Sequence, residues 1–204
     1  MKKIFRFKQF EVDQSNCAMK INTDGVLLGA MVQHENAKRI LDVGTGTGVI
    51  ALMLAQRFPD AQVCAVEIDE QASATASKNF QLSVFSERLA ISNVAIEQYN
   101  NGEKFDLIIS NPPYIAVYDA SVESVVRDYE PHLALYAGTD GMDAHRHIIS
   151  QAGEWLVTDG LLVLEIGHEQ GPEIRNLLDE NSFIDIEIRQ DYSRRDRIAL
   201  ARKN

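Results

Sequence analysis

Leu41-Asp42-Val43-Gly44-Thr45-Gly46-Thr47-Gly48 is the stretch of this 204-residue chain that decides the fold. Residues 39–43 predict a buried strand before the glycines, and residues 49–57 show helical spacing after them. A strand, a glycine-rich turn and a helix form the first unit of a doubly wound α/β fold. Such glycines let the backbone turn sharply and approach a ligand closely. The dinucleotide-binding fingerprint needs its third glycine at position 49, which is Val49, so the pattern disfavours a dehydrogenase.

A second predicted strand, residues 62–68, has an acid close to its end. Glu67 lies 19 residues beyond Gly48, where an acid can accept hydrogen bonds from both hydroxyls of a ribose. The alternative is that Glu67 belongs to the acids that open the next helix, of which Asp69 is the expected N-cap.

Asn111-Pro112-Pro113-Tyr114 directly follows residues 105–109, an apolar run that predicts another buried strand. Each proline lacks an N–H and fixes its own φ, so the strand ends there and no helix begins at once. Open α/β sheets bind ligands at this end of a strand. The Asn111 amide and a backbone carbonyl can hold the two hydrogens of a planar –NH₂ group, and Tyr114 can stack on it. The alternative is a proline loop with a polar cap.

The remaining pattern predicts a three-layer α/β sandwich with a seven-stranded, mostly parallel sheet. Five strands belong to βα units, and the last two form an antiparallel hairpin. The further strands are expected at residues 89–94, 161–166, 183–189 and 197–201, and the further helices at 71–80, 143–157 and 169–180. The pattern loosens from Tyr114 to about residue 140, and a long loop beside a ligand site is usually functional or disordered. Its notable residues are Glu123, Arg127, Tyr129, Glu130 and Pro131.

Residues 1–36 form an N-terminal extension before the α/β domain of residues 37–204. A helical run at residues 26–33 follows Thr23 and Asp24, either of which suits an N-cap. This helix either packs on the domain or forms a lid over a cofactor pocket. In the second case the polar side chains of Lys20, Thr23 and Asp24 lie at the mouth of the pocket.

The composition limits the possible partners. A net charge of −10 and a pI near 4.9 argue against broad nucleic-acid binding, although they allow a local basic patch. No apolar run approaches the ~18 residues of a membrane span, and no signal peptide is evident. Cys17 and Cys64 are too few and too far apart for a metal site or a disulfide framework. We therefore expect a cytoplasmic protein that uses neither a metal nor a membrane.

The charge is distributed unevenly along the chain. Residues 1–110 contain 11 basic and 13 acidic side chains, whereas residues 111–204 contain 9 basic and 17 acidic ones. The basic residues are mostly Lys in the first part and almost entirely Arg in the second. Either chance or a chain joined from two sources explains the change.

The chain resembles class I S-adenosylmethionine-dependent methyltransferases that act on planar nitrogens. The resemblance rests on residues 41–48, Glu67 and the Asn-Pro-Pro-Tyr motif, and it covers about residues 39–204. It implies S-adenosyl-L-methionine as the cofactor, with its methionine part on the glycine loop and its ribose on Glu67. The implied cofactor-binding residues are Thr23, Asp42, Gly44, Thr45, Gly46, Gly48, Glu67, Ile68, Ala95 and Asn111. The implied catalytic residues are Asn111, Pro112, Pro113 and Tyr114. Ala95 stands where many relatives carry an acid, so adenine contact is expected from backbone groups near Ala95 and Ile96.

Two subfamilies are similar to different halves of the chain. Residues 5–110 resemble bacterial methyltransferases of an adenine in the anticodon loop of a valine tRNA, through residues 7–10, 17–20 and 23–30. Residues 110–204 resemble glutamine methyltransferases of peptide-chain release factors, through residues 126–131, 164–167 and 195–197. The loop after Tyr114 and the acidic second half favour a release-factor glutamine amide as the acceptor. The alternatives are N6 of a tRNA adenine and a cofactor-binding module without turnover.

Overall fold

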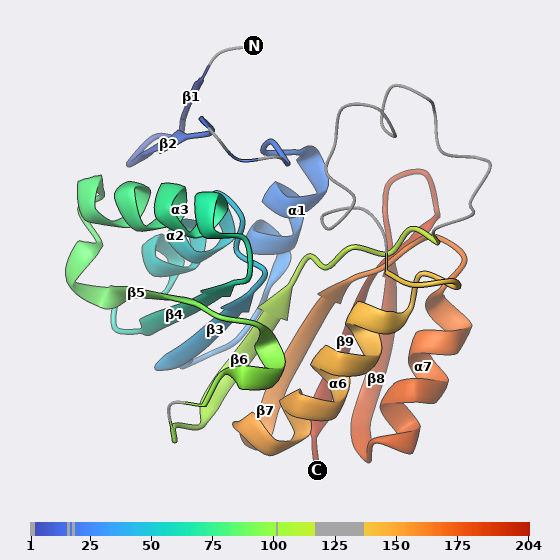
Figure 1. Cartoon of the computed structure of the whole chain (residues 1–204). Helices are drawn as coiled ribbons and strands as arrows, with labels where there is room; N and C mark the ends of the chain where they lie inside the picture. Colours follow the sequence, from blue (N-terminus) through green and yellow to red (C-terminus); the bar gives the residue numbers. More distant parts are fainter. Residues whose placement is uncertain (1–2, 16, 18, 101, 117–136) are drawn as a thin grey trace.

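The computed structural model describes residues 3–15, 17, 19–100, 102–116 and 137–204 (Figure 1). The loop residues singled out between Glu123 and Pro131 lie outside this part of the chain. The described elements form one large sheet, a small hairpin and helices on both faces of the large sheet. The strands are β1 (Ile4–Arg6), β2 (Glu11–Asp13), β3 (Arg39–Val43), β4 (Gln62–Glu67), β5 (Leu89–Asn93), β6 (Phe105–Ser110), β7 (Leu156–Glu165), β8 (Phe183–Gln190) and β9 (Asp196–Lys203). The helices are α1 (Thr23–Met31), α2 (Val49–Arg57), α3 (Glu70–Leu82), α6 (Asp143–Trp155) and α7 (Gly171–Glu180), with short 3₁₀ turns η1 (Ser86–Arg88) and η2 (Ile96–Gln98).

The large sheet has seven strands in the order β5-β4-β3-β6-β7-β9-β8. The pairs from β5 to β7 are parallel, whereas β9 runs antiparallel to both β7 and β8. This confirms the predicted architecture. The chain builds outward from β3 to β5 and then returns to place β6 on the other side of β3. The direction of winding therefore reverses between β3 and β6, and ligands bind at such a switch point.

The central strands are buried on both faces. In β3, Ile40 belongs to a hydrophobic cluster shared with α1, α2 and α3, and the next residue, Leu41, belongs to a second cluster shared with α6 and α7. Because successive side chains of a strand point to opposite faces, this alternation requires helices on both sides of the sheet. The three-layer sandwich follows from it.

The N-terminal extension shares the core of the α/β domain. Phe10 and Val12 are buried in the same cluster as α2 and α3. Asn79 of α3 accepts a hydrogen bond from the Asp13 amide at 2.9 Å and donates to the Asp13 carbonyl at 3.0 Å. The β1–β2 hairpin is thus fastened to α3 beside the large sheet (Figure 1).

Several predicted boundaries are wrong, and the largest error is at the start of β7. The helix expected at residues 143–157 ends at Trp155, and β7 begins at Leu156 instead of residue 161. The fully buried Leu156 pairs with Phe105, and the ladder is irregular until Leu161 pairs with Leu107. Burial of the Leu156 side chain between strand and helices outweighs the turn signal of the residues that follow it.

The first helix also begins earlier than expected, at Thr23, and ends at Met31. Its N-cap is Asn22 and not Thr23 or Asp24. Asn22 has an extended backbone, and its side-chain oxygen accepts a hydrogen bond from the Gly25 amide at 2.8 Å. A side chain in this position satisfies one of the unpaired amides of the first turn.

Candidate functional site

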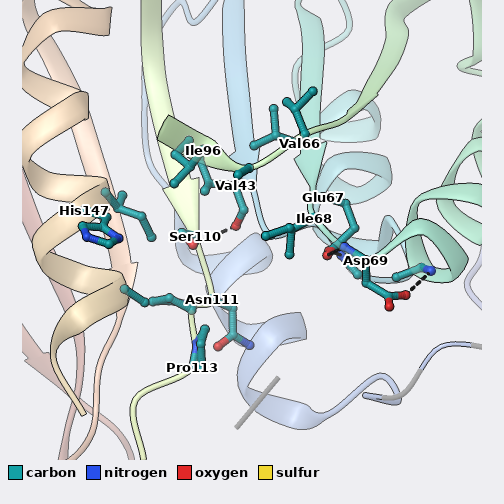
Figure 2. A pocket seen from close by; sticks show the side chains of 18 of the residues that line it. Val43, Val66, Glu67, Ile68, Asp69, Ile96, Ser110, Asn111, Pro113 and His147 are labelled. Carbon is teal, nitrogen blue, oxygen red and sulfur yellow. Dashed lines mark hydrogen bonds between the residues drawn. The ribbon is translucent and has the colours of Figure 1, made fainter. Parts of the chain in front are cut away.

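A cavity of about 320 Å³ opens at the carboxyl ends of β3, β4, β5 and β6. Figure 2 shows Glu67 and His147 on opposite sides of it, with Asn111 and Pro113 between them. The residues that bound it are Cys17, Met19, Val43, Gly44, Gly46, Val66, Glu67, Ile68, Asp69, Ala72, Val94, Ala95, Ile96, Glu97, Ser110, Asn111, Pro112, Pro113, Ala144, His147 and Ile148. The topology thus brings the glycine loop, the acid of β4 and the Asn-Pro-Pro segment to one cavity.

The glycine loop has two roles in this structure. Gly44, Gly46 and Gly48 all have positive φ, at 70°, 57° and 82°. A Cβ built on Gly44 or Gly46 meets no atom within 4 Å, so these two glycines leave open space at the cavity wall. A Cβ on Gly48 would lie 2.6 Å from Cε1 of Phe80. Gly48 therefore lets the loop pack on α3, and it is not among the residues that bound the cavity.

The buried Asp42 side chain stabilises the glycine loop through hydrogen bonds. Its carboxylate is fully buried and accepts hydrogen bonds from Thr45 Oγ1 at 2.5 Å and from the Ala51 amide at 3.1 Å. Among the described residues, no donor reaches its second oxygen, Oδ1. Burial raises the pKa of Asp42 to about 7. Asp42 and Thr45, both predicted to bind cofactor, thus lie beneath the cavity wall and fix the shape of the loop.

Glu67 faces the same loop from the end of β4. Its carboxylate accepts hydrogen bonds from the amides of Gly46 at 2.8 Å and Asp69 at 3.0 Å. A carboxylate has about four acceptor positions, so these two bonds leave room for further donors. Asp69 is the N-cap of α3, as predicted, because its side chain accepts from the Ala72 amide at 2.7 Å.

Asn93, at the end of β5, is a structural contributor that sequence reasoning missed. Its Nδ2 donates to the carbonyls of Glu67 at 2.8 Å and Ile68 at 3.2 Å. These bonds tie the ends of β4 and β5 together, and the chain continues from Asn93 to Ala95 and Ile96 of the cavity wall. The polar pair Ser92-Asn93 after the apolar residues 89–91 was the available signal.

The end of the cavity that Asn111 bounds lies beside the N-terminus of α1. A Cβ built on Gly25 would lie 3.5 Å from Nδ2 of Asn111, so the helix start and this amide are close neighbours. Thr23, predicted to contact the cofactor, is exposed and does not bound the cavity. Asn111, Pro112 and Pro113 do.

Tyr114 turns toward the end of β7 and does not bound the cavity. Its hydroxyl donates a hydrogen bond of 3.4 Å to Oε1 of Glu165. Burial raises the pKa of Tyr114 to about 12 and that of Glu165 to about 7. The hydroxyl is thus tied to β7, and the Tyr114 ring lies beside Gly167, where a built Cβ would be 3.3 Å from its Cδ2.

Gln170, a residue that sequence reasoning missed, fixes the backbone of this segment. Its Nε2 donates to the carbonyls of Tyr114 at 3.2 Å and Gly141 at 3.1 Å, and its Oε1 accepts from the Gly167 amide at 2.9 Å. A Cβ on Gly141, whose φ is 78°, would lie 2.5 Å from the Tyr114 carbonyl oxygen. Three loops thus meet at one side chain, a contact between distant segments that no local pattern encodes.

The family described as the methyltransferase small domain matches residues 17–133. The chain belongs to this family. It is 41% identical over 182 residues to the tRNA1(Val) (adenine(37)-N6)-methyltransferase of Yersinia pestis, a match that covers 88% of this chain and 70% of that protein. It is 65% identical over 114 residues to the protein of the same name from Pedobacter heparinus, covering 56% of this chain and 49% of that protein. The latter match therefore spans about half the length of that relative.

Solved structures support the same fold. A predicted O-methyltransferase from Agrobacterium tumefaciens has a TM-score of 0.66 at 22% identity and covers 89% of this chain and 81% of its own. An O-methyltransferase from Thermotoga maritima has a TM-score of 0.65 at 18% identity and covers 91% of this chain and 66% of its own. At these identities the likeness concerns the fold alone.

The chain is therefore an S-adenosylmethionine-dependent methyltransferase, as predicted. The residues present fit this cofactor, since Gly44 and Gly46 leave open space where a side chain would intrude and Glu67 retains acceptor positions. The 182 residues aligned with the Yersinia protein cannot fit within residues 1–110. The likeness to the tRNA methyltransferases thus extends into the half that resembles glutamine methyltransferases, and these relatives favour the tRNA alternative over the release-factor interpretation.

Among the described residues, no helix is long and apolar enough to span a membrane. The same part of the chain contains no cluster of three or more His, Cys, Asp or Glu side chains that could hold a metal ion.

Proposed function

We propose that this chain transfers a methyl group from S-adenosylmethionine to the exocyclic N6 of an adenine in tRNA. One observation carries the proposal: a single cavity joins Gly44, Gly46 and Glu67 at one end to Asn111 and Pro112 at the other. A donor held at the first end can therefore meet an acceptor held at the second. The names of the Yersinia and Pedobacter relatives supply the acceptor class.

Each part of the cofactor has a candidate position in the cavity. The open backbone at Gly44 and Gly46 suits the methionine part, and Glu67 suits the ribose hydroxyls. Val94 to Ile96 and the exposed side chain of Ile68 provide apolar surface for the adenine. Cys17 and Met19 also bound the cavity, so we assign the N-terminal extension to the cofactor site.

The acceptor end can align and activate a planar amine. The Asn111 side-chain oxygen and the Pro112 carbonyl would accept the two amino hydrogens of adenine, which leaves the nitrogen lone pair free to face the methyl group. Positive charge develops on this nitrogen during transfer, and two carbonyl dipoles aimed at its hydrogens stabilise that charge. The sulfonium supplies an already activated methyl group, so the protein needs no covalent intermediate.

An assay with two acceptors tests the proposal. The full chain is incubated with tritiated S-adenosylmethionine and, separately, with unmodified tRNA transcript and with a peptide-chain release factor. We expect tritium in tRNA, recovered as N6-methyladenosine after digestion to nucleosides. Label recovered only in a glutamine of the release factor would replace this proposal by the glutamine interpretation. Cofactor binding without transfer to either acceptor would favour a module without turnover.

A further inference from the structure

The turn that joins β8 to β9, residues 191–195, lies on the side of the sheet where the parallel strands end and the cavity opens. The strands β3 to β7 are parallel and end at this edge, and β9 runs antiparallel to β7, so it begins there. The preceding strand, β8, must end at the same edge, since it is antiparallel to β9. Figure 1 shows the turn as the red loop beyond the end of β7, on the side of the sheet where α7 begins.

The turn exposes one aromatic and two basic side chains. Tyr192 is 99% exposed, and Arg194 and Arg195 are also exposed. Within the described residues, neither guanidinium forms an ion pair or a hydrogen bond, and the Tyr192 ring contacts no other aromatic ring. An aromatic ring held fully in water beside two unpaired cations is a surface available to a partner.

The turn is held in shape by its own hydrogen bonds. Oδ1 of Asp191 accepts from the amides of Ser193 at 2.7 Å and Arg195 at 3.1 Å. The Asp191 amide donates to the Arg195 carbonyl at 2.9 Å, and Arg197 pairs with Oδ2 of Asp191 at 3.5 Å. A turn that is ordered before binding loses less conformational entropy on binding than a flexible one.

We propose that this turn binds single-stranded RNA beside the target adenine, with a base stacked on Tyr192 and phosphates bound by Arg194 and Arg195. The inference rests on the proposed function and extends it to how an acidic protein holds RNA. Residues 111–204 contain 17 acidic against 9 basic side chains, so most of this half repels phosphate. An exposed aromatic ring next to arginines is the arrangement by which proteins bind single strands without reading the sequence.

The position of the turn suits this role. Asn111 directly follows β6, and β7, β9 and β8 come next in the sheet. Neighbouring strands lie about 4.8 Å apart, so the turn is on the order of 10–15 Å from the acceptor end across the sheet. Nucleotides that flank the target adenine in the same loop can reach across that span.

Two variants of the full chain test the inference. Tyr192→Ala removes the stacking surface, and Arg194→Ala/Arg195→Ala removes both charges. The control, Lys38→Ala/Lys104→Ala, removes two charges from exposed residues at the opposite edge, directly before β3 and β6. None of these residues belongs to the cavity wall.

We expect both turn variants to raise the KM for unmodified tRNA by about 10-fold or more, because the first loses a stacked base and the second loses two phosphate contacts. The value of kcat and the Kd for S-adenosylmethionine should stay unchanged. The double arginine variant should also reduce the slope of log K against log salt by about 2, one for each lost phosphate contact. The lysine control should change none of these quantities.

Direct tRNA binding separates this inference from the proposed function. If the wild type binds tRNA without methylating it and the turn variants bind more weakly, the proposed function fails and the turn inference stands. If the wild type methylates tRNA and the turn variants match the lysine control, the turn inference is overturned alone. A turn that affects only the KM for a release factor would also overturn it, in favour of a protein partner.

Discussion

Replacing Asp42 by Asn should remove the loss of folding stability that the ionisation of this buried carboxyl causes as the pH rises. The folded chain holds this carboxyl fully buried, with a pKa of about 7 against its ordinary value of 3.8. The folded state therefore disfavours the charged form. The contribution of Asp42 to stability is fully present below pH 3.8 and is lost as the pH rises through about 7.

The size of the effect follows from the two pKa values of Asp42, folded and unfolded. A difference of one pH unit between them corresponds to about 1.4 kcal/mol, which limits the total cost of ionising Asp42 in the folded state to about 4 kcal/mol. Between pH 5 and pH 8 the same relation gives a loss of about 2–3 kcal/mol for the wild type from this group. Asn keeps an acceptor for Thr45 and for the Ala51 amide but carries no charge, so its contribution is the same at both pH values.

Urea denaturation of both proteins at pH 5 and pH 8 measures the difference. We expect the free energy of unfolding of Asp42→Asn, relative to the wild type, to rise by about 2–3 kcal/mol from pH 5 to pH 8. Glu165 also titrates near pH 7 but is present in both proteins, so its contribution cancels. Ser110→Ala serves as a control, because it removes a buried 2.7 Å bond to the Val43 carbonyl without a titrating group. Its cost of about 1 kcal/mol should be the same at both pH values. An Asp42→Asn difference that does not change with pH would refute the reasoning.

Three further substitutions test the glycine loop, the hydrogen bonds of Gln170 and the acceptor end of the cavity. Gly48→Ala should lower the free energy of unfolding by about 2–4 kcal/mol, measured in urea, because its φ of 82° is left-handed and its Cβ would meet Phe80 at 2.6 Å. Gln170→Ala should lower kcat about 10-fold with little change in the Kd for cofactor, because it frees the backbone of Tyr114, and stopped assays with tRNA measure this. Asn111→Ala should lower turnover by about 10²–10³-fold and affect calorimetric cofactor binding far less.

Matched controls accompany these variants. Gly102→Ala has a similar φ of 71° but open space around its Cβ, so it should cost only about 1–2 kcal/mol. Gln190→Ala removes an exposed side-chain bond to Asp196, and Asn36→Ala changes an exposed residue before β3. Equal losses in each variant and its control would contradict the assigned roles. Unchanged turnover in Asn111→Ala would remove that amide from the mechanism.

The sequence by itself determined the strands and helices of the α/β domain and their mostly parallel sheet with an antiparallel C-terminal hairpin. The boundaries of β3 and α2 were predicted to the residue, because an apolar strand, three glycines and a helical repeat are local signals that burial reinforces. The prolines at positions 112 and 113 placed the end of β6 to within one residue, at residue 109 against the observed Ser110. From these elements and the rules of right-handed parallel winding, the position of the ligand site at the carboxyl edge follows.

Tertiary structure alone decided which residues of each motif face the cavity. Gly44 and Gly48 look alike in sequence, yet the first borders open space and the second presses on Phe80 of a helix that comes later in the chain. Asp42 and Glu67 are both acids near strand ends, but one lies under the loop and the other beside it. The three bonds of Gln170 and the start of β7 at Leu156 also depend on segments far apart in the chain. Local preferences set the elements, whereas packing between them sets where each side chain points, and only a folded chain contains that information.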